Sequence, residues 1–188
     1  MQGILKARKM EEIVVREIDP LLSLRRKLVP STVLVFEVEK EGSVYVLKTS
    51  SSCFQWGVEH IKREAEILEL AKDIEGITHL VRRYPDSDDY ESSILKEFFY
   101  GRSLALFHEK VKSSVAQARL EKAVCGLHSL GVMDLDIGPK NIVLSETEDD
   151  ARIIDLGYGQ IYKPDEIAKS AIDMMKLGDL RKLERLFG

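Results

Sequence analysis

The feature that most constrains this chain is a pair of polar turns that lie close together in the sequence. Residues 134–141 read Asp-Leu-Asp-Ile-Gly-Pro-Lys-Asn, and residues 152–157 read Arg-Ile-Ile-Asp-Leu-Gly. Asp136 and Asn141 are five residues apart, so both side chains can point into one cleft from a single loop. Asp155 follows two isoleucines, which predict a buried strand that brings its carboxylate to the same cleft. Such carboxylate and amide oxygens suit Mg²⁺.

This pair of turns resembles the protein-kinase catalytic loop, H-R-D-L-x-x-x-N, and its D-F-G partner. The resemblance implies that Asp136 orients and deprotonates a substrate hydroxyl, and that Asn141 and Asp155 ligate the metal. Lys140 could reach the γ-phosphate. Either turn taken alone is better explained as an acidic turn on the surface.

Upstream residues add to the resemblance. Residues 32–39 and 44–49 are rich in β-branched and aromatic residues and flank Glu-Gly-Ser, which predicts a β-hairpin. Lys48 lies near the end of the second strand, like the strand lysine that binds the α- and β-phosphates in kinases. Glu64 lies on a helix expected over 56–72 and resembles the glutamate that pairs with that lysine, with Glu66 as the nearby competitor. Separately, each residue could be an ordinary surface charge.

The adenine pocket is implied by the resemblance alone. Glu97 would begin the hinge, and the backbones of Glu97 and Phe99 would contact the base. Val33 and Val46 would lie above the adenine and Val143 beneath it. Lys96 falls where kinases usually carry an apolar residue at the back of the pocket, which is a departure from the family's pattern.

The rest of the chain predicts an α+β protein with a kinase-like two-lobe fold. We expect a small antiparallel sheet with one helix in residues 1–100, and a truncated, mainly helical lobe in residues 101–188. Further elements are expected as a possible strand over 12–18, strands over 77–83, 93–99, 141–144 and 151–156, and helices over 104–108, 113–130 and 165–187. Asp173, on the last helix, resembles the kinase aspartate that braces the catalytic loop, although a solvated helix residue is nearly as good an explanation.

Four departures from the kinase pattern limit which kinases the chain resembles. No G-x-G-x-x-G precedes the hairpin, and residues 26–31 occupy its place. The family's His-Arg is here Asp134-Leu135, and the lysine two residues after the catalytic aspartate is Gly138. Asp173 lies only 18 positions after Asp155, which leaves no room for a long activation segment. In these respects the chain is similar to the compact atypical kinases of the RIO and Bud32 type and to small-molecule phosphotransferases.

The resemblance implies an ATP- and Mg²⁺-dependent phosphotransferase, most simply an atypical serine/threonine protein kinase. The phosphate acceptor would be a protein or a small molecule that carries a hydroxyl group. One alternative is a pseudokinase that uses the fold as a scaffold for partners, which the missing glycine loop favours. A thermal shift with ATP and Mg²⁺ discriminates between the two, because a ligand that binds only the native state must stabilise it.

The composition limits which partners and which cellular location are expected. The 188 residues are 44% hydrophobic and carry a net charge of −4, so neither an anionic membrane nor a nucleic acid is an expected partner. The basic cluster Arg25-Arg26-Lys27 is too short to change this expectation. No apolar run approaches the roughly 20 residues that span a bilayer. Two cysteines form no disulfide framework, which favours a reducing, cytoplasmic location. The four histidines show no metal-ligand spacing, and the oligomeric state is not indicated.

Overall fold

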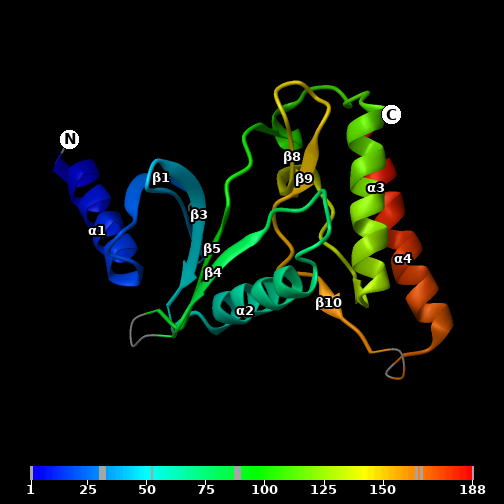
Figure 1. Ribbon diagram of the computed structural model, residues 1–188, viewed down its shortest axis with the longest axis horizontal. Helices are drawn as coiled ribbons and strands as arrows, with labels where there is room; N and C mark the ends of the chain where they lie inside the picture. Colours follow the sequence, from blue (N-terminus) through cyan, green and yellow to red (C-terminus); the bar gives the residue numbers. More distant parts are fainter. Residues whose placement is uncertain are drawn as a thin grey trace. The chain divides into compact units, whose positions relative to one another are not determined.

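The computed structural model describes residues 2–29, 33–51, 53–86, 90–163, 165 and 167–187 (Figure 1). These residues include four α-helices and a five-stranded antiparallel sheet, so the expected α+β class is confirmed. The chain divides into two compact units, residues 1–62 with 80–98 and residues 63–79 with 99–188. The kinase-like two-lobe arrangement and the boundary at residue 100 stay predictions. Within the described ranges, no helix combines the length and apolar character needed to cross a bilayer.

The first unit consists of the antiparallel sheet, helix α1 and the first part of helix α2. Its elements are α1 (Gln2–Ile18), β1 (Ser23–Val29), β2 (Leu34–Lys40), β3 (Ser43–Ser50), α2 (Gln55–Leu70), β4 (Leu80–Tyr84) and β5 (Ser92–Glu97). The strands lie in the order β1-β2-β3-β5-β4. α2 continues beyond this unit, because the division between the units falls inside it, after Lys62.

The β2–β3 hairpin is the element that the sequence predicts best. Lys40 pairs with Ser43, and the two residues between them, Glu41 and Gly42, have φ angles of 52° and 78°. Two successive positive φ angles are typical of the type I′ turn, whose twist matches that of the flanking strands. The expected hairpin is confirmed, except that Thr32, the first residue of the expected strand, lies outside the described residues.

One face of the sheet is the core of the first unit. Phe36 pairs with Leu47, and alternation along the strands puts Val38 on the same face. These side chains form one buried cluster with Val15 of α1 and Leu95 of β5. α1 therefore covers this face of the sheet, and the opposite face carries Lys48.

Helix α1 is a correction to the possible strand over residues 12–18. The β-branched run Ile13-Val14-Val15 favours a strand by local propensity, yet Val15 is fully buried as part of a helix that packs on the sheet. Packing of an apolar helix face outweighs a short β-branched run, because helices in proteins are stabilised mainly by tertiary contacts. β1 was not expected either. It pairs with β2, and the pairing includes Arg26, the first of the residues 26–31 that take the place of the glycine loop. Pro30 and Ser31, the last two of them, lie outside the described residues.

A buried carboxylate fastens the end of α1 to the sheet. Asp19 is 5% exposed and accepts hydrogen bonds from the Leu21 backbone N–H at 3.0 Å, the Tyr84 hydroxyl at 2.9 Å and the Lys40 Nζ at 3.3 Å. Burial alone would raise the pKa of Asp19, but these hydrogen bonds outweigh it and hold that pKa below its ordinary value. The ionised carboxylate therefore stabilises the fold.

Asp19→Ala is expected to lower the free energy of unfolding by roughly 2–4 kcal/mol at pH 7, because it leaves buried donors without an acceptor. Since the folded pKa is depressed, the charge-dependent part of this loss is present above the ordinary pKa of 3.8 and vanishes as pH falls through the folded value. Urea unfolding at several pH values measures both effects. The exposed neighbour Glu17 is the control, and Glu17→Ala should change stability by less than about 0.5 kcal/mol. An equal loss for both variants would contradict the role of Asp19.

The second unit combines the end of α2 with short strands and two long helices. Its further elements are β6 (Arg102–Ser103), the 3₁₀ turn η1 (Leu104–Leu106), α3 (Ser114–Ser129), β7 (Val132–Met133), the 3₁₀ turn η2 (Pro139–Asn141), β8 (Ile142–Leu144), β9 (Ala151–Ile153), β10 (Gln160–Ile161) and α4 (Lys169–Glu184). β6, β8 and β9 form one small sheet, and β10 pairs with β7.

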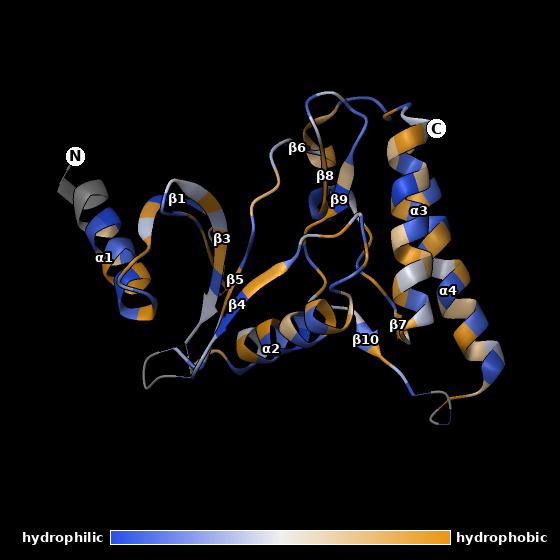
Figure 2. Cartoon of the chain, viewed as in Figure 1, coloured by the Kyte–Doolittle hydropathy of each residue, from blue (hydrophilic) through white to orange (hydrophobic). Residues whose placement is uncertain are grey.

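Helix α3 confirms the helix expected over 113–130. The Ser113 hydroxyl accepts the Ala116 backbone N–H at 3.2 Å, and Gly131 ends the helix with a φ of 80°. Leu120 and Leu127 lie on its buried face. Figure 2 shows both hydrophobic and hydrophilic residues along α3, as expected for a helix with one buried face.

Candidate active site

The β8–β9 hairpin places two of the expected metal ligands at the same end. Ile142 pairs with Ile153, and the Ile154 backbone N–H donates to the Asn141 carbonyl at 2.9 Å. Asn141 comes directly before β8 and Asp155 two residues after β9. Because the strands are antiparallel, the start of the first strand and the end of the second meet, and Asn141 and Asp155 leave the hairpin together.

Asn141 also holds the expected catalytic carboxylate. Its Nδ2 donates to the Asp136 carbonyl and to the Asp136 Oδ2, both at 2.9 Å. Both bonds use the amide nitrogen, so the amide oxygen takes part in neither. The Lys140 Nζ lies 3.8 Å from the Asp136 Oδ2, and both side chains are partly or largely exposed. A carboxylate that is oriented by an amide and accessible to solvent can accept a proton from a bound hydroxyl.

The loop is braced from α4 by an aspartate that sequence reasoning missed. Asp179 is 1% exposed, and its Oδ1 accepts the Leu135 backbone N–H at 3.0 Å. Its Oδ2 lies 3.1 Å from the Nε2 of the buried His128, which donates to the carboxylate. Lys182 donates from its Nζ to the Leu135 carbonyl at 2.8 Å. Both backbone polar groups of Leu135 are thus held by α4.

Asp173, the residue expected to brace the loop, is exposed, and the prediction is wrong. It lies six positions before Asp179, so the two side chains are about 240° apart around the helix axis. The buried face of α4 contains Asp179 and Leu183, one helical turn apart. The spacing of an acid and a leucine four residues apart is a sequence signal for this buried face, but its interpretation requires the start of α4.

Asp134 and Leu135, which stand where kinases have His-Arg, lie in the part of the loop that α4 holds. Leu135 is 1% exposed, so its side chain belongs to the core of the second unit, while its backbone carries the hydrogen bonds to α4. Asp134 has a φ of 56°, and its Oδ1 lies 4.0 Å from the Lys182 Nζ. The loop is therefore anchored through its backbone.

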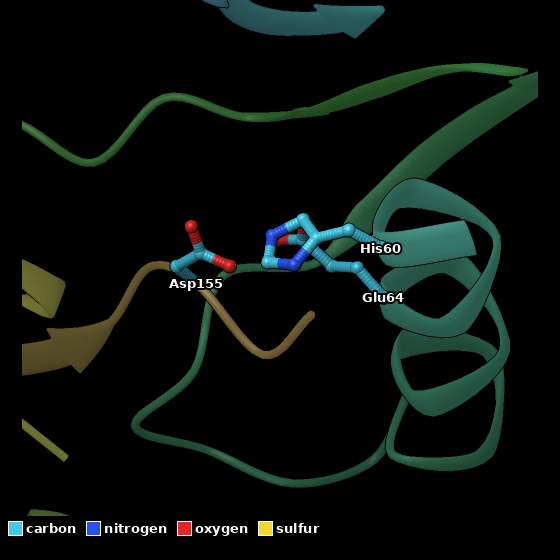
Figure 3. A group of neighbouring side chains, drawn as sticks. All are labelled: His60, Glu64 and Asp155. Carbon is cyan, nitrogen blue, oxygen red and sulfur yellow. The ribbon is translucent and has the colours of Figure 1, made fainter. Parts of the chain in front are cut away.

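Glu64 lies beside Asp155 (Figure 3). It is fully buried on α2, and the Asp155 Oδ1 accepts the Gly157 backbone N–H at 3.1 Å. The chain after Asp155 packs on the same helix, because a Cβ built on Gly159 would come within 3.0 Å of Ile67. Glu64 and Asp155 each offer a carboxylate oxygen, and these two atoms lie within 4.8 Å of each other.

Lys48 belongs to the first unit. It lies in β3 between Val35 of β2 and Ile94 of β5 and is 5% exposed. Val46 lies two residues earlier, between Glu37 and Lys96, and Lys96 is 2% exposed. The position that departs from the kinase pattern is therefore a buried lysine.

The other residues expected around the adenine are divided between the units. Val33 packs near the start of α2, where a Cβ on Gly57 would meet it at 3.2 Å, and Glu97 ends β5 opposite Tyr45. In the second unit the Arg152 guanidinium lies 4.7 Å from the centre of the Phe99 ring. Val143 pairs with Arg152 on β9 and is 9% exposed.

The donor set of the second unit fits Mg²⁺. Asp155 offers a carboxylate and Asn141 an amide oxygen, both from one end of a hairpin, and Mg²⁺ prefers few protein oxygens and keeps its waters or phosphate oxygens for the remaining positions. Asp136 is tied to Asn141 and so lies next to that pair. This arrangement can hold a metal and a hydroxyl group side by side.

Comparison with known proteins gives a partial likeness. No protein-family model matches the chain. Calcium-dependent protein kinase 6 of Arabidopsis thaliana is 30% identical to it over 123 residues, which are 61% of this chain. The match covers 22% of the plant protein, so the chain spans about a fifth of the length of this relative. The chain thus has a kinase-related similarity over part of its length.

Proposed function

We propose that the chain is an ATP- and Mg²⁺-dependent phosphotransferase that acts as an atypical serine/threonine protein kinase. One observation carries the proposal. Asn141 and Asp155 leave the same end of the β8–β9 hairpin, and Asn141 holds the carboxylate of Asp136 beside them. The partial similarity to a plant protein kinase supports it.

Each residue of the second unit has a role in this proposal. Asp155 and Asn141 would hold Mg²⁺, which neutralises the charge of the phosphates when bound. Asp136 orients the acceptor hydroxyl and takes its proton, and Lys140 stabilises charge on the transferred phosphoryl group. The hydrogen bonds from α4 to Leu135 keep the loop rigid, which matters because phosphoryl transfer depends mainly on positioning and charge.

The remaining roles extend the proposal to ATP. Lys48 would contact the α- and β-phosphates, with Glu64 as its carboxylate partner. The adenine would lie between aliphatic side chains and bind the hinge backbone, the residues being Val33, Val46, Val143, Glu97 and Phe99. Lys48 in its buried setting on β3 is the most useful probe of this part, because Lys48→Met should weaken ATP binding and leave the sheet intact.

The proposal is tested by incubating the chain with γ-labelled ATP and Mg²⁺, alone and with acceptor proteins such as casein. We expect label on serine or threonine, and we expect Asp155→Asn to lower the transfer by at least about a hundredfold, since one ligand of the metal is lost. Asp149→Asn is the matched control, because Asp149 is an exposed carboxylate in the turn at the opposite end of the same hairpin. It should transfer phosphate at the unmodified rate.

One result would overturn the proposal, and another would correct its acceptor class. If ATP with Mg²⁺ gives no increase in melting temperature and no label appears, the chain is a scaffold that does not use the nucleotide. If label passes to small hydroxyl compounds and to no protein, the acceptor class is wrong although the phosphotransfer stands.

A further inference from the structure

Helix α4 of the second unit exposes two large apolar side chains. Met174 is 74% exposed, the largest exposed fraction among the large hydrophobic side chains of the described residues, and Leu177 is 46% exposed. Asp179 and Leu183 form the buried face of the same helix, which packs beside α3 (Figure 1). The exposed pair therefore lies on the side of α4 that faces solvent.

The residues around this pair form a continuous stripe along the helix. Successive residues of an α-helix are 100° apart, so the residues of the stripe fall within about 100° of arc, and they are Leu177, Arg181, Met174, Arg185 and Gly178. Both arginines are exposed, and the second of them, the C-cap residue, keeps helical backbone angles. This stripe, which we call the outer face of α4, extends over about three turns. Its spacing is that through which one helix packs on another.

Gly178 lies in the middle of the outer face. Glycine is the least favourable residue inside a helix apart from proline. A Cβ added at this position would meet no atom within 4 Å, so no neighbour among the described residues requires the missing side chain. Glycine does allow another backbone to come close to the helix. The position therefore suits contact with a second helix.

The charges of the outer face favour an acidic partner. Neither Arg181 nor Arg185 forms an ion pair with any described residue, although the chain as a whole has a net charge of −4. The nearby acids, Asp173 and Glu184, lie just outside the stripe, beyond Leu177. A second copy of the chain would present the same stripe and hence no carboxylate to the arginines. Two arginines also contact few phosphates, which favours a protein over a nucleic acid.

We propose that the outer face of α4 is a docking site for an acidic amphipathic helix of a partner protein. Apolar side chains of that helix pack on Met174 and Leu177, and its backbone crosses near Gly178. Its carboxylates pair with Arg181 and Arg185. A methionine suits such a surface, because its flexible side chain adapts to different apolar partners. The proposal does not depend on the phosphotransfer, since none of these residues takes part in it.

The test uses a designed helical peptide of about 18 residues, because shorter helices are marginal in water. The peptide carries fluorescein, leucines at alternate spacings of three and four, and glutamates elsewhere. A second peptide has lysine in place of every glutamate. Fluorescence anisotropy at about 0.15 M salt should show that the full chain binds one equivalent of the acidic peptide saturably. The lysine peptide should bind at least about tenfold more weakly.

Substitutions in the outer face should change this binding in different directions. Arg181→Glu combined with Arg185→Glu should reverse the preference, so that the lysine peptide binds at least about tenfold more tightly than the acidic one. Gly178→Ala should raise the melting temperature by about 2–4 °C, since alanine favours the helix, and yet weaken the acidic peptide by about fivefold or more. Lys122→Glu, which reverses an exposed charge on α3, is the matched control and should leave binding unchanged.

Three results would overturn the docking site. The first is equal affinity for both peptides, or unchanged binding of the acidic peptide after both arginines are replaced. The second is a dimer in light scattering that Met174→Glu separates, because the occupant is then a second copy of the chain. The third is tighter binding of a single-stranded RNA than of the acidic peptide, which would assign the arginines to a nucleic acid.

Discussion

Replacing Asp136 with alanine is expected to reduce the proposed phosphotransfer by about a thousandfold or more, while ATP and Mg²⁺ still raise the melting temperature. The carboxylate would orient and deprotonate the acceptor hydroxyl, a contribution that is typically 10²–10⁴-fold. Nucleotide binding should persist, because the proposed ligands of the metal, Asn141 and Asp155, are unchanged. The experiment compares initial rates with γ-labelled ATP and, separately, the thermal shift.

Two further variants are needed to interpret that result. Asp136→Asn keeps the size of the side chain but lacks a basic oxygen, so it should be as inactive as Asp136→Ala. Asp134→Asn is the control: it lies in the same loop, its φ of 56° is tolerated by asparagine, and it should stay close to the unmodified rate. Transfer by Asp136→Ala at the unmodified rate would show that another group accepts the proton.

The second large effect is expected at Asp179. Asp179→Ala should lower the free energy of unfolding by about 2–4 kcal/mol, because the Leu135 N–H and the His128 Nε2–H lose a buried acceptor. The same change frees the loop that carries Asp136, so the proposed phosphotransfer should fall as well, through loss of positioning. Urea unfolding followed by circular dichroism measures the first effect, and the label assay measures the second.

Asp173→Ala is the control for Asp179. Both residues are aspartates of α4, but Asp173 is exposed, so its removal should change stability by less than about 0.5 kcal/mol and leave transfer unaffected. Asn at position 179 should recover part of the stability, because its amide oxygen can still accept the Leu135 N–H. A large loss in Asp173→Ala with a small one in Asp179→Ala would show that the brace lies at the position first expected.

Local signals predicted several elements correctly. Strand formers on both sides of Glu41-Gly42 predict the β2–β3 hairpin, and Gly42 suits the second positive φ of the turn that the structure has. Ser113 and Gly131 mark the two ends of α3. In these cases the information lies within a few residues of the element itself, so one sequence is sufficient.

Long-range packing decided what local signals could not. Residues 12–18 form a helix because Val15 is buried in one cluster with Phe36 and Leu95, which are far away in the sequence. The helix expected over 165–187 begins at Lys169, and the residue before it, Ala168, provides no side-chain cap. Because no capping residue marks the start of α4, the sequence alone does not predict which face of this helix is buried. It therefore does not predict that Asp179 points inward.

For the candidate site as well, local sequence predicts some features and tertiary packing decides others. Asp136, Asn141 and Asp155 are proposed as site residues from their spacing and residue type, because a loop and the strand after it are continuous in the sequence. Tertiary structure alone decided that Asp179 holds the loop and that Glu64 lies beside Asp155. A sequence records which residues are neighbours along the chain, whereas burial and hydrogen bonding between distant helices depend on the packing that only folding produces.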